Sequence, residues 1–417
     1  MTKIEVPYFR PAITDAEVDE VVDALRSGWL TSGPKVKQFE RDFALAAGAS
    51  HAVAVNSCTA ALHLAVEALG LKAGQAVLVP TMTFAATAEI VRYMGAFPVL
   101  VDCDPVTLNV DLEDARRKLD ALRSGKLRAE IPDGARPVGI IPVHVGGLML
   151  DVRRVQAFAA ENDLWIVEDA AHSFPAAWKP SPIQAWERCG EGTAAVTCFS
   201  FYANKTITTG EGGMATTGDA DLAARMRLMS LHGLSKDAWE RYSGGRSWDY
   251  RIAAPGYKYN MTDVAAAIGI HQLRRAESMR LARQTVAARF CEALADVAEL
   301  DVPPQDENRV HAWHLFPIRL RLDRLSIDRN AFIDGLKDAG VGCSVHWRPL
   351  HLHAYYEETF RWRPEDFPVA TEVWERLVSL PIFPDMREEE VEHVVASVKA
   401  ICLAHRKSPA RAVEVRS

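Results

Sequence analysis

The amino-terminal part of the chain has the hydrophobic pattern of an amphipathic helix. Between Thr14 and Gly28, apolar residues recur every three or four positions, and charged residues occupy many of the positions between them. Thr14 suits the N-cap and Gly28 the C-cap of a helix. The pattern therefore predicts a helix over residues 16–25.

Short apolar runs and helical patterns then alternate as far as residue 167. The first unit has an apolar run at residues 52–55, a polar turn at 56–59 and a helical pattern at 60–69. Further apolar runs lie at residues 76–80, 98–102, 139–143 and 164–167, and helical patterns separate them. Strands that alternate with helices predict a mainly parallel sheet with helices on both faces. Ligands of such sheets bind beyond the carboxyl ends of the strands.

The second half of the chain combines irregular segments with a long helix. Residues 179–192 and 234–255 are rich in Trp, Arg, Ser, Gly and Pro and lack periodicity, which indicates long loops. A helical pattern runs from Thr262 to Leu294 and would connect two domains. Beyond it, the patterns predict a strand and two helices, at residues 313–320, 329–339 and 388–403.

The length of the chain also favours more than one domain. A chain of 417 residues exceeds what one hydrophobic core usually organises. We expect a large domain over residues 1–275, a smaller α+β domain over residues 276–405 and a frayed polar tail over residues 406–417.

Composition and charge argue against several classes of protein. Apolar residues make up 48% of the chain and charged residues 25%, which is the balance of a folded globular protein. The net charge of −7, without basic runs, argues against nucleic acid or a membrane surface as a partner. No apolar stretch is long enough to span a bilayer, and charges interrupt residues 1–11, so we expect no secretory signal. The seven cysteines are far apart and form no CxxC pair, which indicates a reducing cytoplasm and no structural zinc.

A carboxylate and a lysine follow two apolar strands. Asp169 comes just after the apolar run at 164–167, in Glu168-Asp169, and Lys205 follows a second run that starts at Cys198. Pyridoxal 5′-phosphate (PLP) needs an amine for a Schiff base and an anion that keeps its pyridine nitrogen protonated. Taken alone, Asp169 would more often be a cap or turn residue, and Lys205 a solvated one. Their joint position at neighbouring strand ends favours a PLP site.

Two further features would complete such a site. The turn that contains Ser57, Cys58 and Thr59 precedes a predicted helix, whose amino end offers free N–H groups and a positive dipole to a phosphate. Ordinary N-capping explains this turn about equally well. Phe84 follows another strand and could stack on a flat cofactor, although a buried core position is the commoner explanation of an isolated phenylalanine.

Four motifs give the chain a resemblance to a known family. They lie at residues 27–34, 168–172, 199–213 and 255–263. With these motifs the chain resembles the DegT/DnrJ/EryC1/StrS family of sugar aminotransferases over nearly its whole length. The resemblance implies the α/β type I PLP-dependent transferase fold, as in aspartate aminotransferase. That fold has a mainly parallel seven-stranded sheet in a three-layer large domain and a smaller α+β C-terminal domain. Residues 255–263 and 311–316 are most similar to the branch that makes UDP-4-amino-4-deoxy-L-arabinose.

The resemblance also implies roles for individual residues. Lys205 would form the Schiff base and move protons, and Asp169 would pair with the pyridine nitrogen. His172 would lie near the phenolic oxygen of the cofactor, and Phe84 would stack on its ring. The phosphate would be held by Ser57, Cys58, Thr59 and Ser200.

The resemblance further implies a homodimer with shared active sites. In this family, a polar residue from a loop of the second subunit reaches the phosphate or the substrate. In this chain either Lys258 or Asn260 could make that contact. We expect substrate contacts from Trp29, Thr31, Tyr202, His314 and His346.

The activity implied by the resemblance is a ping-pong transamination. An amino group would pass from L-glutamate to a nucleotide-linked keto sugar, such as a UDP-4-keto sugar. The acceptor stays open, because this chain departs from the family where a substrate could be recognised. It has Tyr202 in place of a common histidine, and tryptophan-rich loops around Trp178, Trp186, Trp239 and Trp248. The alternatives are another keto sugar, an aminocyclitol precursor or a non-catalytic regulator with the same fold.

Other chemistries have weaker support in the sequence. A PLP-dependent sugar dehydratase of this family would carry histidine in place of Lys205. An NAD-dependent oxidoreductase would need a Gly-rich fingerprint followed by an acidic residue, which the strand–turn–helix units lack. The histidines between residues 311 and 353 lack the spacing and the carboxylate of a metal site, so we expect no metal.

Overall fold

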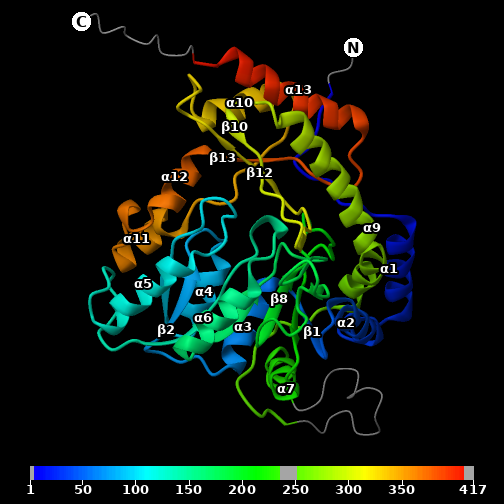
Figure 1. The fold of residues 1–417 in the computed structure, drawn as a ribbon. Helices are drawn as coiled ribbons and strands as arrows, with labels where there is room; N and C mark the ends of the chain where they lie inside the picture. Colours follow the sequence, from blue (N-terminus) through cyan, green and yellow to red (C-terminus); the bar gives the residue numbers. More distant parts are fainter. Residues whose placement is uncertain (1–3, 235–250, 408–417) are drawn as a thin grey trace, which may run out of the picture.

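The structure is a computed structural model that describes residues 4–234 and 251–407 (Figure 1). Trp239, Trp248 and most of the irregular segment predicted at residues 234–255 lie outside the described residues. Residues 408–417 of the predicted tail also lie outside them, so its fraying stays a prediction.

A seven-stranded sheet forms the centre of the molecule, with the strand order β1-β9-β8-β5-β4-β2-β3. In that order the strands are His51–Val55, Gly213–Thr217, Val196–Ser200, Trp165–Asp169, Arg136–Ile140, Gln75–Pro80 and Phe97–Val101. β9 runs antiparallel to its neighbours β1 and β8, whereas the other neighbouring strands pair in parallel. The mainly parallel seven-stranded sheet expected from the sequence is therefore confirmed.

Helices cover both faces of this sheet and produce three layers (Figure 1). Successive residues of a strand point to opposite faces, so Val77 and Val79 of β2 belong to one apolar core, and Ala76 and Leu78 to the other. The first core packs against α3 (Cys58–Ala68), α4 (Ala86–Tyr93) and α7 (Ala220–Met229). The second packs against α2 (Pro34–Ala47), α5 (Leu112–Arg123), α6 (Val152–Asn162) and α9 (Asp263–Leu294).

The predicted caps define the ends of two long helices. α1 (Asp15–Ser27) begins with a capping box between Thr14 and Glu17 and ends at Gly28, whose left-handed φ of 77° suits a glycine C-cap. α9 begins after Thr262, whose hydroxyl accepts a hydrogen bond from the N–H of Ala265 at 3.2 Å. Both helices are present where the hydrophobic pattern predicted them.

A smaller antiparallel sheet and two helices form the C-terminal part (Figure 1). The sheet has the order β10-β12-β13 (Leu300–Asp301, Phe316–Leu320, Leu377–Leu380), and α10 (Arg329–Asp338) and α13 (Glu388–Ala404) pack on it. α9 supplies Phe290 to this third core and Ile270 to a core of the large sheet. The domain boundary predicted at residue 275 falls inside α9, and the division stays a prediction.

Short elements complete the described chain. β6 (Ala177–Trp178), β7 (Glu187–Arg188) and β11 (Arg309–Val310) form a small sheet, and α11 (Ala354–Phe360) and α12 (Pro368–Arg376) pack on the large-sheet core. Three single turns of 3₁₀ helix are η1 (Val145–Gly147), η2 (Leu350–Leu352) and η3 (Pro364–Asp366). The strand predicted at 313–320 begins only at Phe316, because Trp313 has a left-handed φ of 50° and stacks on His311.

None of the described helices is both long and apolar enough to cross a membrane.

Candidate active site

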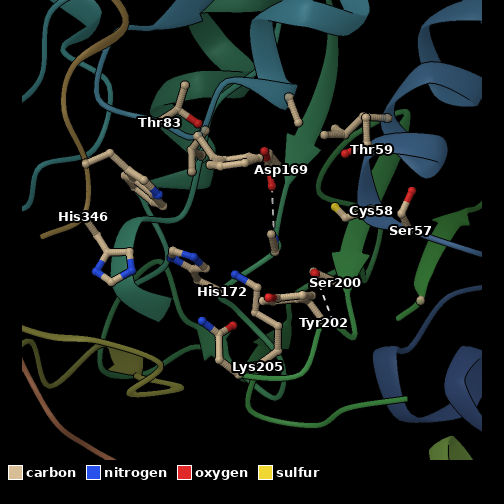
Figure 2. Close-up of a pocket in the computed structure, with 18 of the residues that line it drawn as sticks. Ser57, Cys58, Thr59, Thr83, Asp169, His172, Ser200, Tyr202, Lys205 and His346 are labelled. Carbon is tan, nitrogen blue, oxygen red and sulfur yellow. Dashed lines mark hydrogen bonds between the residues drawn. The ribbon is translucent and has the colours of Figure 1, made fainter. Parts of the chain in front are cut away.

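The carboxyl ends of the central strands border a cavity of about 560 Å³ (Figure 2). This volume suits a cofactor or another small molecule. Ten residues predicted from the sequence line it, namely Ser57, Cys58, Thr59, Phe84, Asp169, His172, Ser200, Tyr202, Lys205 and His346. The fold thus brings together side chains that are far apart in the sequence.

Lys205 lies in the turn after β8 and points into this cavity (Figure 2). Its N–H donates to the carbonyl oxygen of Tyr202 at 2.9 Å, which closes the turn. The side chain is half-buried, so the solvated position considered from the sequence is wrong. Burial lowers the pKa of Lys205 to about 8, although Cys58 and Asp169 oppose the shift. A lysine that is partly uncharged near neutral pH is suited to act as a nucleophile.

Asp169 faces the same cavity from the end of β5 (Figure 2). It is the last residue of β5, whereas the apolar run predicted a strand that ends two residues earlier, at residue 167. Its Oδ2 accepts a hydrogen bond from Oγ1 of Thr87 at 2.7 Å, and its Oδ1 accepts one from the N–H of Ala171 at 3.1 Å. Burial raises the pKa of Asp169, while these two hydrogen bonds and the charge of Lys205 lower it.

The strand that ends at Asp169 and the strand that precedes Lys205 are neighbours. β5 and β8 pair in parallel, with Asp169 opposite Cys198. Because the carboxyl ends of parallel strands meet at one edge of a sheet, the turn with Lys205 starts beside Asp169. The predicted proximity of the two strand ends is therefore confirmed.

Three histidine rings cluster at one side of the cavity. The ring of His172 lies 4.2 Å from that of His314 and stacks on Trp347 at 4.9 Å. Nδ1 of His172 accepts a hydrogen bond from the N–H of Gly146 at 3.3 Å, so the neutral ring carries its proton on Nε2. Burial lowers the pKa of His172 and His314 well below the usual value, and that of His346 to about 4. All three rings are therefore neutral near pH 7.

The amino end of α3 and the end of β8 form a polar cradle at another side of the cavity, defined as Ser57, Cys58 and Thr59 at the start of α3 and Ser200 of β8. Oγ of Ser57 accepts a hydrogen bond from the N–H of Ala60 at 3.1 Å and caps the helix. The N–H groups of Cys58 and Thr59 lie in the first turn, where a helix offers them no acceptor. N-capping and anion binding are thus compatible here, because the cap uses one N–H and leaves others for a ligand.

Phe84 and Tyr202 are the exposed aromatic side chains of the cavity. They are 63% and 47% exposed, respectively. The buried core position considered for Phe84 is therefore wrong. Two large rings that remain accessible beside a cavity are available to a ligand.

Some cavity residues were not identified from the sequence. Thr83 and Trp347 line the cavity, and each stands next to a predicted residue, Phe84 and His346 respectively. That adjacency was the only signal, because neither lies in a motif with a recognisable chemical role. Asn204, next to Lys205, is a further example.

Five predicted residues lie outside the lining of the cavity, namely Trp29, Thr31, Lys258, Asn260 and His314. Nε2 of His314 is 3.5 Å from Nζ of Lys205, so this ring lies directly behind the lining. The amide of Asn260 donates to the hydroxyls of Ser32, at 2.8 Å, and Thr31, at 3.4 Å. The exposed Lys258 donates to Asn260. The ligand contacts predicted for these residues stay predictions.

One buried cluster in the described chain has metal-ligand atoms within 4.8 Å of one another, in His144, Glu168 and Cys189. Two threonine hydroxyls donate to Glu168 at 2.6 and 2.9 Å. The N–H of Leu150 donates to Nδ1 of His144 at 3.3 Å, which leaves a proton on Nε2, 3.7 Å from the carboxylate of Glu168. Glu168 thus has hydrogen-bond donors within the protein, whereas Nε2 of His144 has no hydrogen-bond partner in the described part of the chain. The cluster contains none of the histidines between residues 311 and 353.

The cavity residues fit PLP in three respects. Lys205 is half-buried with a lowered pKa, as a covalent link to the cofactor requires. Asp169 is a buried carboxylate that can hold a protonated ring nitrogen. The cradle offers hydroxyls and a helix amino end to a phosphate.

The sequence comparisons agree with this geometry. Residues 11–399 match the DegT/DnrJ/EryC1/StrS aminotransferase family. The chain is also similar to the spore coat polysaccharide biosynthesis protein SpsC of Bacillus subtilis. The two are 42% identical over 397 residues, which cover 95% of this chain and 97% of SpsC.

Solved structures of relatives have the same fold. Spr1654 of Streptococcus pneumoniae in its PLP form has a TM-score of 0.83 and 30% identity, covering 96% of this chain and 99% of that one. The sugar aminotransferase CalS13 of Micromonospora echinospora has a TM-score of 0.79 and 29% identity, covering 95% and 99%. The fold is therefore that of the type I PLP-dependent transferases. The chain belongs to the DegT/DnrJ/EryC1/StrS aminotransferase family and is a PLP-dependent aminotransferase.

Proposed function

We propose that this protein transfers an amino group from L-glutamate to a nucleotide-linked keto sugar, with a UDP-4-keto sugar as the leading acceptor. The reaction would be a ping-pong transamination, in which 2-oxoglutarate leaves before the sugar binds. The observation that carries the proposal is the presence of Lys205, Asp169 and a helix amino end in one cavity. Similarity to SpsC, a polysaccharide biosynthesis protein by name, supports a sugar acceptor.

Lys205 and Asp169 would act on different parts of the cofactor. Lys205 would act at the carbon to which the amino group is attached, and Asp169 at the pyridine nitrogen. When bound, PLP withdraws electrons from the carbon that carries the amino group, through its protonated pyridine ring. Asp169 would hold the proton on the pyridine nitrogen, because a buried carboxylate gains most from a positive partner. Lys205 would hold the cofactor covalently. Its Nζ, released when an amino donor takes its place, would accept and return the proton that moves in each half of the reaction.

The other cavity residues would orient the ring and the phosphate. His172 carries its proton on Nε2 and would donate it to the phenolic oxygen. The exposed ring of Phe84 would stack on the cofactor and exclude water from one face. The cradle would hold the phosphate through its hydroxyls and the free N–H groups of α3.

The phosphate charge calls for a cation from outside the chain. Among the described residues that line the cavity, Lys205 is the only lysine or arginine, and its Nζ is engaged in the cofactor linkage. We therefore propose a homodimer in which a partner subunit completes the site, either with the positive charge of its Lys258 or with the hydrogen-bond donor of its Asn260. The N–H of Asn56, next to the cradle, donates to the carbonyl oxygen of Tyr259 at 2.7 Å, so this loop borders the site at the surface.

The acceptor would bind beside the residues proposed for substrate contact. Tyr202 and His346 line the cavity, His314 lies behind it, and Trp29 and Thr31 would act from the loop that Asn260 binds. Resemblance to the branch that makes UDP-4-amino-4-deoxy-L-arabinose favours a UDP-linked sugar. Another keto sugar or an aminocyclitol precursor is tested in parallel.

Two broader expectations belong to the same proposal. All seven cysteines are free thiols, which supports a cytoplasmic location. Ile270 of α9 belongs to a core of the large sheet, and Phe290 of the same helix belongs to the core of the C-terminal part. This supports a large domain up to residue 275 and a smaller one from 276 to 405.

The experiment incubates the PLP-loaded protein with L-glutamate and one acceptor at a time, and follows 2-oxoglutarate and the aminated product by mass spectrometry. The acceptors are a UDP-4-keto sugar, a dTDP- and a GDP-linked keto-deoxyhexose and a keto-cyclitol. We expect equal amounts of 2-oxoglutarate and amino sugar with the UDP-4-keto sugar, and neither with Lys205→Ala. One equivalent of 2-oxoglutarate without any aminated acceptor would contradict the proposed sugar, and no 2-oxoglutarate would contradict the donor.

A further inference from the structure

Two threonine hydroxyls form a chain that ends on Asp169. Oγ1 of Thr87 donates to Oδ2 of Asp169 at 2.7 Å, and Oγ1 of Thr83 lies 2.7 Å from Oγ1 of Thr87. Thr83 is 2%, Thr87 0% and Asp169 5% exposed. Thr83 lines the cavity (Figure 2), whereas Thr87 lies behind it in the first turn of α4.

The direction of these hydrogen bonds follows from the number of protons. A hydroxyl carries one proton, and that of Thr87 points to the carboxylate of Asp169. The proton of Thr83 must therefore point to Thr87, because Thr87 has no second proton to donate. Donors linked in this way polarise one another. Both hydroxyls thus stabilise a negative charge on Asp169.

Asp169 needs this support because of its position. Burial raises the pKa of its carboxyl and so favours the neutral acid. The hydrogen bond from Thr87 is the largest effect that opposes burial, ahead of the hydrogen bond from Ala171 and the charge of Lys205. Without it, the carboxyl would be neutral over a wider range of pH and would lose its charge interaction with a protonated ring.

We propose that Thr87 is a positioning residue for the cofactor: its hydroxyl keeps Asp169 ionised and fixes Oδ2, and Thr83 orients the hydroxyl of Thr87. This inference rests on the proposed role of Asp169 at the pyridine nitrogen. Loss of the Thr87 hydroxyl then weakens PLP binding, and the loss grows as the pH falls.

Substitution of Thr87 removes none of the other titratable groups around Asp169. Lys205 and His144 lower the pKa of Asp169 by charge interactions. Burial and Asp169 raise the pKa of the thiols of Cys58 and Cys198, which stay neutral. A change in the pH dependence of PLP binding can therefore be assigned to the hydroxyl of Thr87.

The direction of the pH effect on PLP binding follows from the form of Asp169 that binds PLP, which is the ionised carboxylate. PLP binding that needs the Asp169 carboxylate is complete above the pKa of Asp169 and is lost as the pH falls through it. Removing a donor from a buried carboxylate raises this pKa. The acid-side loss of binding must therefore move to higher pH.

The test compares Thr87→Val and Thr87→Ser with the full-length wild type. Valine keeps the shape of threonine without the hydroxyl, and serine keeps the hydroxyl. Thr216→Val is the matched control, because Thr216 is 1% exposed and its hydroxyl donates to the carbonyl oxygen of Thr197 in the sheet. The Kd for PLP is measured by absorbance titration across a pH series, with thermal unfolding as a check on folding.

For Thr87→Val we expect the Kd for PLP at neutral pH to rise on the order of tenfold. The acid-side midpoint of binding should rise by about one pH unit. Thr87→Ser and Thr216→Val should match the wild type. A Thr87→Val protein with the wild-type Kd and midpoint would overturn the inference. An equal loss at every pH that serine does not rescue would overturn it too, because that is the result of a purely structural role. A wild type that binds no PLP would overturn the proposed function and this inference together.

Discussion

Gly213 packs directly against the backbone of Ser57. A Cβ atom on Gly213 would stand 2.4 Å from the carbonyl carbon of Ser57 and 2.6 Å from the amide nitrogen of Cys58, well inside ordinary contact. Gly213 begins β9, which pairs with β1 on one side and β8 on the other, so the sheet holds it in place. The absence of a side chain lets the cradle lie against the sheet at this point.

Gly213→Ala should therefore displace the cradle and weaken PLP binding. The added methyl group has backbone atoms as neighbours, so relief requires the turn at Ser57 to move, at a cost of about 1–3 kcal/mol in the free energy of unfolding. Retention of PLP after dialysis and the midpoint of urea unfolding measure the two effects. Gly218→Ala is the matched control, since its Cβ would meet nothing within 4 Å. Equal behaviour of the two variants would show that the cradle does not depend on this contact.

The lowered pKa of Lys205 predicts how the apoenzyme takes up PLP. The reactive amine is the neutral form, and burial lowers the pKa of Lys205 to about 8. The rate of PLP attachment should therefore rise with pH through about 8 and level off above about 9. Stopped-flow absorbance of PLP-free protein mixed with PLP measures this rate, with N-acetyl-lysine amide as the solvent-exposed comparison. A protein rate that follows the free amine up to about pH 10 would be incompatible with a buried Lys205.

Asp169→Asn should retain the fold and lose most of the activity. The amide has nearly the shape of the carboxylate, but it carries no charge to hold the proton on the pyridine nitrogen. Breaking a buried ion pair costs about 3–5 kcal/mol, so kcat should fall on the order of 100-fold or more. Steady-state kinetics with saturating PLP measure the loss, and Asp120→Asn, on the exposed face of α5, is the control. Near wild-type kcat in Asp169→Asn would remove Asp169 from the mechanism.

Asp263 joins two of the motifs that carry the family resemblance. Its carboxylate accepts hydrogen bonds from the N–H groups of Gly33 at 2.8 Å, Lys35 at 3.2 Å and Val36 at 3.0 Å. Asp263→Ala leaves these groups without their acceptor and should lower the free energy of unfolding by about 2–4 kcal/mol. Chemical denaturation measures this, with the exposed Asp221→Ala as the control. A difference below about 0.5 kcal/mol between the two variants would mean that Asp263 does not anchor the loop.

Much of the fold was predictable because its signals are local. Apolar runs gave the parallel strands, and Thr14 and Thr262 marked the starts of two helices that the structure confirms. No apolar run predicts β9, because Gly213–Thr217 has little apolar character and lies antiparallel between two other strands. α2 was missed although Val36, Phe39 and Phe43 recur at helical spacing after Pro34. That signal was present and could have been used.

The active-site residues that could be predicted are the reactive residues that lie at or just after the ends of strands. Asp169 and Lys205 each follow an apolar run, so sheet geometry alone places them together. The contact between His172 and Trp347 could not be predicted, because it depends on how the C-terminal segment packs across the cavity. The hydrogen bond from Thr87 to Asp169 depends in the same way on packing that brings the first turn of α4 to the end of β5. Long-range packing of this kind leaves no periodic mark in a single sequence.

The most direct test of the account is the absorbance spectrum of the purified protein, wild type and Lys205→Ala, before and after L-glutamate. We predict that the wild type shows the band of lysine-bound PLP, that L-glutamate removes the band, and that a keto-sugar nucleotide restores it. Lys205→Ala should show neither the band nor the response. A wild type that takes up no PLP, even after incubation with the free cofactor, would contradict the central claim that this cavity is a PLP-dependent active site.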